Sequence, residues 1–223
     1  MSHSSVAARD EARHNMVDNQ LRANKVHDDR VLDAFLRLRR ELFLPPGLRG
    51  VAYIDEDLPV APGRYLMEPM VAARLVQALA VQPKDAALVV GAGVGYEAAV
   101  LGLLARSVIA LEEDSQLARI GRSALVDHRI ASVTYVEAPL KGGHRARAPY
   151  DVILFGGAVA AIPDEISAQL AEGGRMSVVL REPGSVGRAA LITRTGAVLA
   201  RRVIFDAATP LLPGFEAEPG FEF

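Results

Sequence analysis

The sequence contains no cysteine, which excludes disulfide bonds, thiolate zinc sites and a cysteine nucleophile. Its five histidines are scattered and lack the spacing of metal ligands, so we expect no metal site. No apolar run approaches the length of a transmembrane helix, and residues 1–10 lack the apolar region of a signal peptide. These absences favour a cytoplasmic protein.

No sign of charge dominates, because 25 basic and 27 acidic residues give a net charge of −2. Such a balance does not indicate a nucleic-acid or membrane partner. Half of the residues are hydrophobic, which is enough for a sizeable core. The length of 223 residues suits one α/β domain with an N-terminal extension.

The most informative stretch, residues 87–101, reads Ala-Leu-Val-Val-Gly-Ala-Gly-Val-Gly-Tyr-Glu-Ala-Ala-Val-Leu. Its short apolar run is typical of a strand buried on both faces of a parallel sheet. The alternating glycines permit a sharp turn and close approach of a ligand, and the helix expected after them would point its first N–H groups at that ligand. The Gly-x-Gly-x-Gly spacing favours an S-adenosylmethionine (SAM) site over a dinucleotide site, although a glycine turn without a ligand has the same pattern.

An acidic residue, Glu112, directly follows the next expected strand, Ser107 to Leu111. An acid at that strand end can bind both ribose hydroxyls of a cofactor. The alternative is that Glu112 or Glu113 caps the following helix together with Asp114. The candidate cofactor-binding residues are Gly91, Ala92, Gly93, Gly95 and Glu112.

Strands and helices alternate along the chain, which predicts a mostly parallel sheet covered on both faces. We expect strands at 87–90, 107–111, 132–136, 151–155 and 176–180, and an antiparallel hairpin at 189–193 and 198–205. Helices are expected at 11–21, from Asp28 or Asp29 to Pro45, and at 69–80, 96–101, 115–126 and 162–171. Residues 1–10 are expected to be disordered and 47–67 to form a long structured loop, while Gly156-Gly157-Ala158 is either a loop beside the methyl donor or a plain turn.

The chain resembles the protein-L-isoaspartate O-methyltransferase family from about Met16 to Arg202. The motifs that carry the resemblance include Arg40-Glu41-Leu42-Phe43-Leu44-Pro45, Gly95-Tyr96-x-Ala98-Ala99-Val100-Leu101 and Ala148-Pro149-Tyr150-Asp151-Val152-Ile153. The resemblance implies a Rossmann-like SAM-dependent methyltransferase fold, with a doubly wound sheet and an antiparallel C-terminal hairpin. It also implies SAM as cofactor and methyl transfer to the carboxylate of isoaspartyl residues in damaged proteins.

Four positions depart from the pattern of that family. Val89 stands where the family has an acid two positions before the first glycine. Met67 stands where the family has a hydroxyl residue near the acceptor carboxylate, so we assign no catalytic residue. The Gly-Asp-Gly segment after the third strand is replaced by Glu137-Ala138-Pro139, and the Thr-Ala-Ala segment by Gly156-Gly157-Ala158. The loss of two acidic contacts would weaken SAM binding by about 10²-fold or more.

Two hypotheses follow from this sequence. The first is a monomeric SAM-dependent O-methyltransferase with a protein or peptide substrate. Residues 1–68 would then cover the acceptor site, 69–209 would bind SAM, and 210–223 would form a tail that packs through Phe215, Phe221 and Phe223 or stays loose. The alternative is a non-catalytic member of the family, a binding or scaffold protein that has lost SAM binding.

Overall fold

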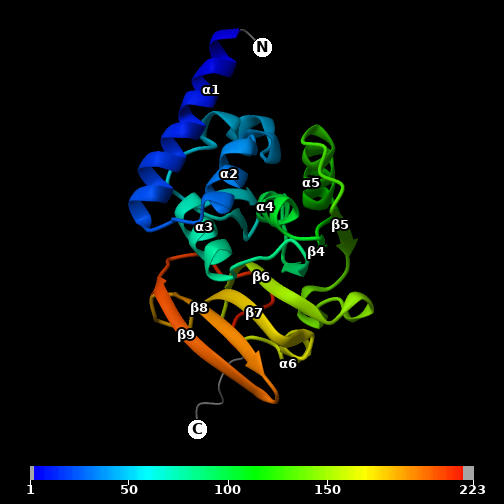
Figure 1. Cartoon of the computed structure of the whole chain (residues 1–223). Helices are drawn as coiled ribbons and strands as arrows, with labels where there is room; N and C mark the ends of the chain where they lie inside the picture. Colours follow the sequence, from blue (N-terminus) through cyan, green and yellow to red (C-terminus); the bar gives the residue numbers. More distant parts are fainter. Residues whose placement is uncertain (1–2, 218–223) are drawn as a thin grey trace.

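The fold is built on a seven-stranded sheet with the strand order β5-β4-β3-β6-β7-β8-β9 (Figure 1). The structure is a computed structural model that describes residues 3–217. Strands β3 to β7 pair in parallel, and β8 and β9 add an antiparallel hairpin at the edge, as the sequence predicts. The strands are β3 Ala86–Val90, β4 Ser107–Glu112, β5 Val133–Glu137, β6 Tyr150–Val159, β7 Leu170–Leu180, β8 Arg188–Thr195 and β9 Val198–Asp206.

Both faces of the central strands are buried, which explains the unbroken apolar run of β3. Ala87 and Val89 point into one hydrophobic cluster, which they share with the N-terminal helices. Leu88 and Val90 point into a second cluster on the opposite face. A strand that alternates between two cores needs apolar side chains at every position. The helices that follow the N-terminal region are α3 Pro69–Ala78, α4 Tyr96–Leu104, α5 Ser115–Asp127 and α6 Asp164–Ser167.

The N-terminal region is helical from its first described residue. It consists of α1 His3–Asn15, a π-helical segment Met16–Leu21, α2 Asp29–Arg37, and 3₁₀ turns at Arg22–Asn24, Arg40–Phe43 and Pro46–Val51. The prediction that residues 1–10 are disordered is therefore wrong for residues 3–10. The prediction rested on the small and polar side chains of residues 1–10. Residues 7–13 are mostly alanine, arginine and glutamate, which have a high helix propensity.

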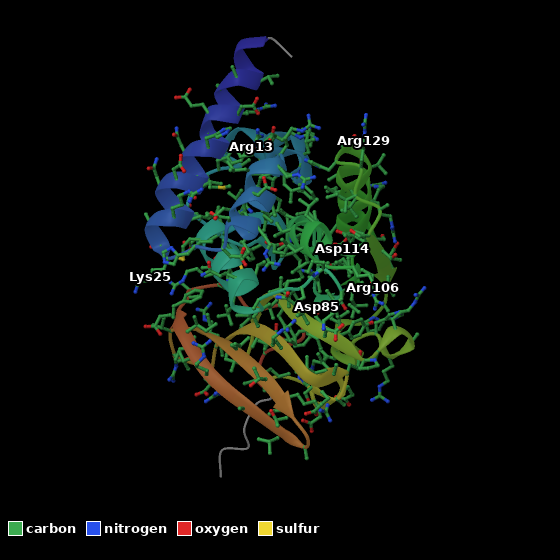
Figure 2. The ribbon with its side chains drawn as sticks, viewed as in Figure 1. Arg13, Lys25, Asp85, Arg106, Asp114 and Arg129 are labelled. Carbon is green, nitrogen blue, oxygen red and sulfur yellow. The ribbon has the colours of Figure 1, made fainter. Side chains whose placement is uncertain are left out.

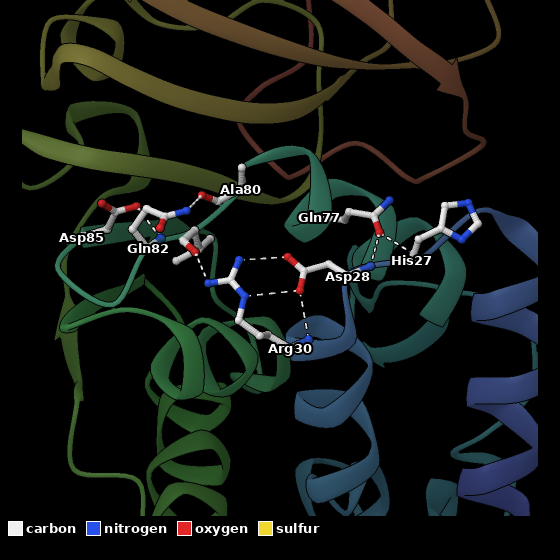
Figure 3. Close-up of polar contacts among 8 residues, drawn as sticks. His27, Asp28, Arg30, Gln77, Ala80, Gln82 and Asp85 are labelled. Carbon is white, nitrogen blue, oxygen red and sulfur yellow. Dashed lines mark hydrogen bonds and ion pairs between the residues drawn. The ribbon is translucent and has the colours of Figure 1, made fainter.

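Polar contacts tie the start of α2 to the end of α3 (Figure 3). The side-chain oxygen of Gln77 accepts hydrogen bonds from the backbone N–H groups of His27 and Asp28. Asp28, one of the two residues at which this helix is expected to begin, caps α2, because its carboxylate accepts the N–H of Arg30 at 2.9 Å. The guanidinium of Arg30 in turn donates to the carbonyl of Val81, just after α3. Asp85 and Arg106, directly before β3 and β4, lie close together, and the N–H of Arg106 donates to the carbonyl of Asp85 (Figure 2).

Further segments differ from the sequence-based expectation. The helix expected from Asp28 or Asp29 to Pro45 ends at Arg37, because Leu38 is already extended. Residues 47–67 contain a separate antiparallel hairpin, β1 Leu58–Ala61 and β2 Arg64–Leu66. The helix expected at 162–171 ends at Ser167, because Leu170 already pairs with Tyr150 of β6. Strand β6 runs on to Val159, so Gly156-Gly157-Ala158 lie inside a strand and not in a loop.

The C-terminal segment crosses the end of β6. The N–H of Ala158 donates to Pro210 and the N–H of Leu212 donates back to Ala158. Phe215 packs edge-on against Phe155 at 6.1 Å between ring centroids, so this part of the predicted packing is confirmed. Phe221 and Phe223 lie outside the described residues. Within residues 3–217, no helix is long and apolar enough to cross a membrane.

Gly156 is a position where β6 tolerates no side chain. A Cβ atom there would lie 2.2 Å from the carbonyl oxygen of Gly91, which is rigid backbone. We expect Gly156→Ala to lower the free energy of unfolding by about 1–3 kcal/mol, the usual cost of overpacking. Gly50→Ala is the control, because no atom lies within 4 Å of its Cβ position. Equal urea midpoints for the two variants would contradict the expectation.

Candidate cofactor site

A glycine loop joins β3 to α4 at the carboxyl edge of the sheet. Gly91, Gly93 and Gly95 have φ values of +71°, +55° and +88°, which side-chain-bearing residues rarely adopt. The N–H groups of Gly91 and Ala92 donate to the carbonyl of Leu111 in the neighbouring strand β4. Gly95 forms the N-terminal cap of α4. The predicted loop and helix start are therefore confirmed as structure.

Glu112 lies at the end of β4 with its side chain fully buried. Its carboxylate accepts the N–H of Gly93 at 2.6 Å and the N–H groups of Glu113 and Asp114 at 2.9 Å each. Asp114, and not Glu112, caps α5 by accepting the N–H groups of Gln116 and Leu117. The structure thus brings Glu112 and the glycine loop together and gives the capping role to Asp114.

Arg64 of β2 supplies the remaining donors to this carboxylate. Its two terminal nitrogens lie 2.6 and 2.5 Å from the two oxygens of Glu112, and its side chain is only 6% exposed. A guanidinium presents two parallel N–H donors to a carboxylate. Two neighbouring ribose hydroxyls would present two O–H donors to the same pair of oxygens. Arg64 therefore occupies the position that the sequence analysis assigns to a ribose.

Leu212 covers the other side of the glycine loop. A Cβ atom on Gly91 would lie 2.9 Å from a methyl carbon of Leu212, and one on Gly157 would lie 2.7 Å from its Cγ. Leu212 and Met67 also line a cavity of about 10 Å³ beside Gly156. Such a cavity holds about one water molecule, whereas sites for small ligands measure about 300–1,000 Å³.

Tyr135 of β5 supports the glycine loop from the side of α5. Its hydroxyl donates to the carbonyl of Gly93 at 3.1 Å. A Cβ on Gly95 or on Gly121 would lie 2.2 or 1.9 Å from that hydroxyl, so both glycines make room for the ring. Burial is the main cause that raises the pKa of Tyr135 far above its usual value, and the Glu112 carboxylate adds to it. Tyr135 therefore stays neutral and acts as a donor.

Met67 lies just before α3, and Arg40 fixes its backbone. The side chain of Met67 is buried, and its carbonyl accepts a hydrogen bond of 2.7 Å from Arg40. Arg40 also donates to the carbonyl of Ala52 at 2.8 Å and lies over the ring of Tyr96. This position carries no group that could donate or accept a proton. The structure accordingly adds no catalytic side chain at Met67.

A buried glutamate lies beneath the same region. Glu97, in the first turn of α4, is only 4% exposed. Burial raises its pKa to about 7, although the positive charge of Arg40 opposes the shift. Arg40 lies over the ring of Tyr96 and so links the N-terminal region with the helix that follows the glycine loop, and its charge acts on Glu97.

Glu68 and Asp57 form an acidic region next to Met67. The N–H of Glu68 donates to the carboxylate of Asp57 at 2.8 Å. Burial and, to a smaller extent, the nearby carboxylates of Asp55 and Asp57 together raise the pKa of Glu68 to about 7. Across residues 3–217, no group of three acidic, histidine or cysteine side chains is placed to hold a metal ion.

The arrangement has the chemistry of a cofactor cradle, but its space is filled. The carboxylate of Glu112 and the glycine backbone suit a ribose and an amino-acid moiety, as SAM would require. Arg64 and Leu212 occupy that space in this conformation, so SAM does not fit until they move. Neither residue belongs to a motif of the sequence. The single available sign was a charged residue, Arg64, directly after Gly63 in an otherwise apolar stretch.

Comparison with known proteins finds one family repeatedly. A family model described as Protein-L-isoaspartate(D-aspartate) O-methyltransferase (PCMT) matches residues 11–200. The protein-L-isoaspartate O-methyltransferase of Koribacter versatilis (strain Ellin345) is 38% identical over 168 residues, covering 75% of this chain and 76% of the relative. The enzyme of the same name from Aromatoleum aromaticum (strain DSM 19018 / LMG 30748 / EbN1) is 36% identical over 208 residues, covering 92% and 94%.

Solved structures show the same fold. One protein-L-isoaspartate O-methyltransferase has a TM-score of 0.79 at 23% identity and covers 92% of this chain and 67% of its own. A structure from Plasmodium falciparum, described as a PCMT in complex with S-adenosyl-L-homocysteine, has a TM-score of 0.75 at 19% identity and covers 90% and 97%. The Rossmann-like methyltransferase fold is therefore confirmed.

Glu112→Gln would remove the buried charge and leave Arg64 without its partner. We expect a loss of about 3–5 kcal/mol in the free energy of unfolding, because breaking a buried ion pair strands the other charge. Glu137→Gln is the matched control, since Glu137 pairs with Glu112 across the strands but forms a half-exposed ion pair with Arg122. That pair is worth at most about 1 kcal/mol. Similar losses in urea unfolding for both variants would refute the expectation.

The raised pKa of Glu97 predicts a pH-dependent stability. Between the usual pKa of 4.5 and about 7, the folded state binds the proton more tightly than the unfolded state. The contribution of Glu97 to stability is therefore lost as the pH rises through this range, by up to about 1.4 kcal/mol per pH unit.

Glu97→Gln abolishes this dependence. The free energy of unfolding of the variant should therefore rise relative to that of the wild type between pH 5 and pH 8. Urea unfolding at each pH measures the difference, to which Glu68 contributes equally in both proteins. Glu113→Gln, at an exposed glutamate, serves as control. Parallel profiles for the wild type and Glu97→Gln would exclude this role of Glu97.

Proposed function

Because the chain belongs to the protein-L-isoaspartate(D-aspartate) O-methyltransferase family, we propose that it is a SAM-dependent methyltransferase acting on isoaspartyl residues of proteins. The family model matches residues 11–200, and the curated relatives of 35–38% identity carry this enzyme name. These names support an enzyme rather than the binding or scaffold protein that was the alternative. SAM is the cofactor of this reaction and supplies the methyl group.

The hydrogen bond between Glu112 and the N–H of Gly93 carries the structural part of this proposal. It joins the acid at the end of β4 to the glycine loop after β3, two elements that are separate in the sequence. Parallel α/β sheets bind their cofactors at this edge. We assign cofactor binding to Gly91, Ala92, Gly93, Gly95 and Glu112.

The acceptor side needs little acid–base chemistry from the protein. An isoaspartyl carboxylate is ionised at neutral pH, so alignment is the main contribution that the chain must provide. This is compatible with Met67 at the position where the family pattern has a hydroxyl residue. Glu68, beside Met67, would repel an acceptor carboxylate when both are ionised.

The same proposal includes the organisation of the chain. Residues 1–68 cover the acceptor side, 69–209 bind SAM, and 210–223 form the tail. The substrate is a protein or peptide, and the enzyme works as a cytoplasmic monomer without nucleic acid. The balanced charge of the chain supports the last point.

Calorimetry with SAM and with S-adenosylhomocysteine (SAH) tests the proposal. We expect both to bind the wild type and neither to bind Gly93→Val, because valine cannot adopt the φ of +55° at this position without strain. Labelled SAM should then methylate a peptide with an isoaspartyl residue but not the same peptide with aspartate.

Circular dichroism of Gly93→Val is needed to show that the variant folds. If the wild type transfers no methyl group to the isoaspartyl peptide and binds neither ligand at millimolar concentration, the proposed function is wrong.

A further inference from the structure

The carboxylate of Glu112 is saturated with donors. It accepts three backbone N–H groups, from Gly93, Glu113 and Asp114, and two donors from the Arg64 guanidinium. These five donors exceed the roughly four lone-pair positions that a carboxylate offers, so no further donor can be added. Two of the backbone donors belong to the end of β4, and the third belongs to the glycine loop after β3. Arg64 is the side-chain donor among these partners.

We propose that Arg64 is an internal competitor of the cofactor and sets the affinity of this chain for SAM. This inference rests on the proposed function, because it concerns SAM at the same cradle, which is formed by the glycine loop and Glu112. The guanidinium takes both oxygens that a ribose diol would bind, and Leu212 fills the adjacent space above Gly91 and Gly157. SAM binds only to the fraction of molecules in which these two side chains have withdrawn.

The two side chains belong to one cover over the cradle. Arg64 comes from the β1–β2 hairpin, which forms its own two-stranded sheet and shares no strand with the main sheet. Leu212 comes from the C-terminal segment. The two parts of the cover touch, because a Cβ on Gly63 at the hairpin tip would lie 3.1 Å from Pro213. Withdrawal of the cover breaks the Arg64–Glu112 pair and the hydrogen bonds of the C-terminal segment with Ala158, but it leaves the pairing within the seven-stranded sheet intact.

The remaining hydrogen bonds keep Glu112 ready for a ligand once Arg64 is absent. Its three backbone donors hold the carboxylate in place and satisfy part of its hydrogen-bonding capacity. The lone pairs released by the guanidinium then face the cradle. Truncation of Arg64 should therefore create the vacant acceptor positions that a ribose needs.

The experiment compares SAH binding to the wild type, Arg64→Ala and Leu212→Ala by calorimetry. SAH is the probe because it carries no methyl group to transfer. The apparent dissociation constant equals the intrinsic constant divided by the open fraction, so removal of the competitor must tighten binding. We expect at least about tenfold tighter binding for Arg64→Ala and a smaller gain for Leu212→Ala.

Arg175→Ala is the matched control. Arg175 forms an ion pair with another buried acid, Asp85, which lies just before β3 and so at the opposite edge of the sheet from Glu112. Its removal should destabilise the protein without changing the affinity for SAH. A gain in Arg175→Ala equal to that in Arg64→Ala would show general loosening and would overturn the proposal.

The outcomes separate this inference from the proposed function. If the wild type binds SAH and methylates the isoaspartyl peptide, and Arg64→Ala binds SAH no more tightly, the competitor is refuted and the function stands. If no variant binds SAH at millimolar concentration and none methylates the peptide, both are refuted. Should Arg64→Ala fail to fold, Leu212→Ala decides, because tighter binding supports the cover and unchanged binding refutes it.

Discussion

A buried carboxylate must be fully hydrogen-bonded, and this constraint on Glu112 organises the site. An ionised carboxylate without partners is far too costly to bury. Glu112 meets the requirement by collecting donors from its own strand end, from the glycine loop and from the β1–β2 hairpin. Because each of these donors comes from a different part of the chain, the single charge fixes the relative positions of three segments.

The glycine loop is constrained equally strongly by what surrounds it. The end of β6 approaches it so closely that Gly156 can carry no side chain, and Tyr135 occupies the room left by Gly95 and Gly121. The glycines of this region therefore serve two purposes. Some adopt backbone angles with positive φ, and others give space to a neighbouring strand or ring.

Most of the fold could be predicted from the sequence because its signals are local. The apolar run of β3, the cap at Asp28 and the glycine spacing each depend on a few neighbouring residues. Glu112 could be found because it follows its strand directly. The same logic failed for residues 162–171, where pairing of Leu170 with Tyr150 outweighs the helical pattern.

Arg64 and Leu212 could not be found in this way. Arg64 lies 48 residues before Glu112 in the sequence, and Leu212 lies far after it. No periodic pattern in the sequence connects either residue with Glu112. Such contacts depend on the path of the hairpin and of the C-terminal segment, which tertiary packing determines. The departures from the family pattern pointed to lost contacts, whereas the structure shows a gained one.

The covalent attachment of Arg64 has a consequence for how the site responds to its surroundings. A free inhibitor is diluted when the protein is diluted, but a tethered side chain keeps the same effective concentration at all times. The competition is therefore a fixed property of each molecule, and only the concentration of the cofactor can change the outcome. The occupancy of the cradle then follows the concentration of SAM in the cell, and the strength of the Arg64–Glu112 ion pair sets the concentration range over which the cradle fills.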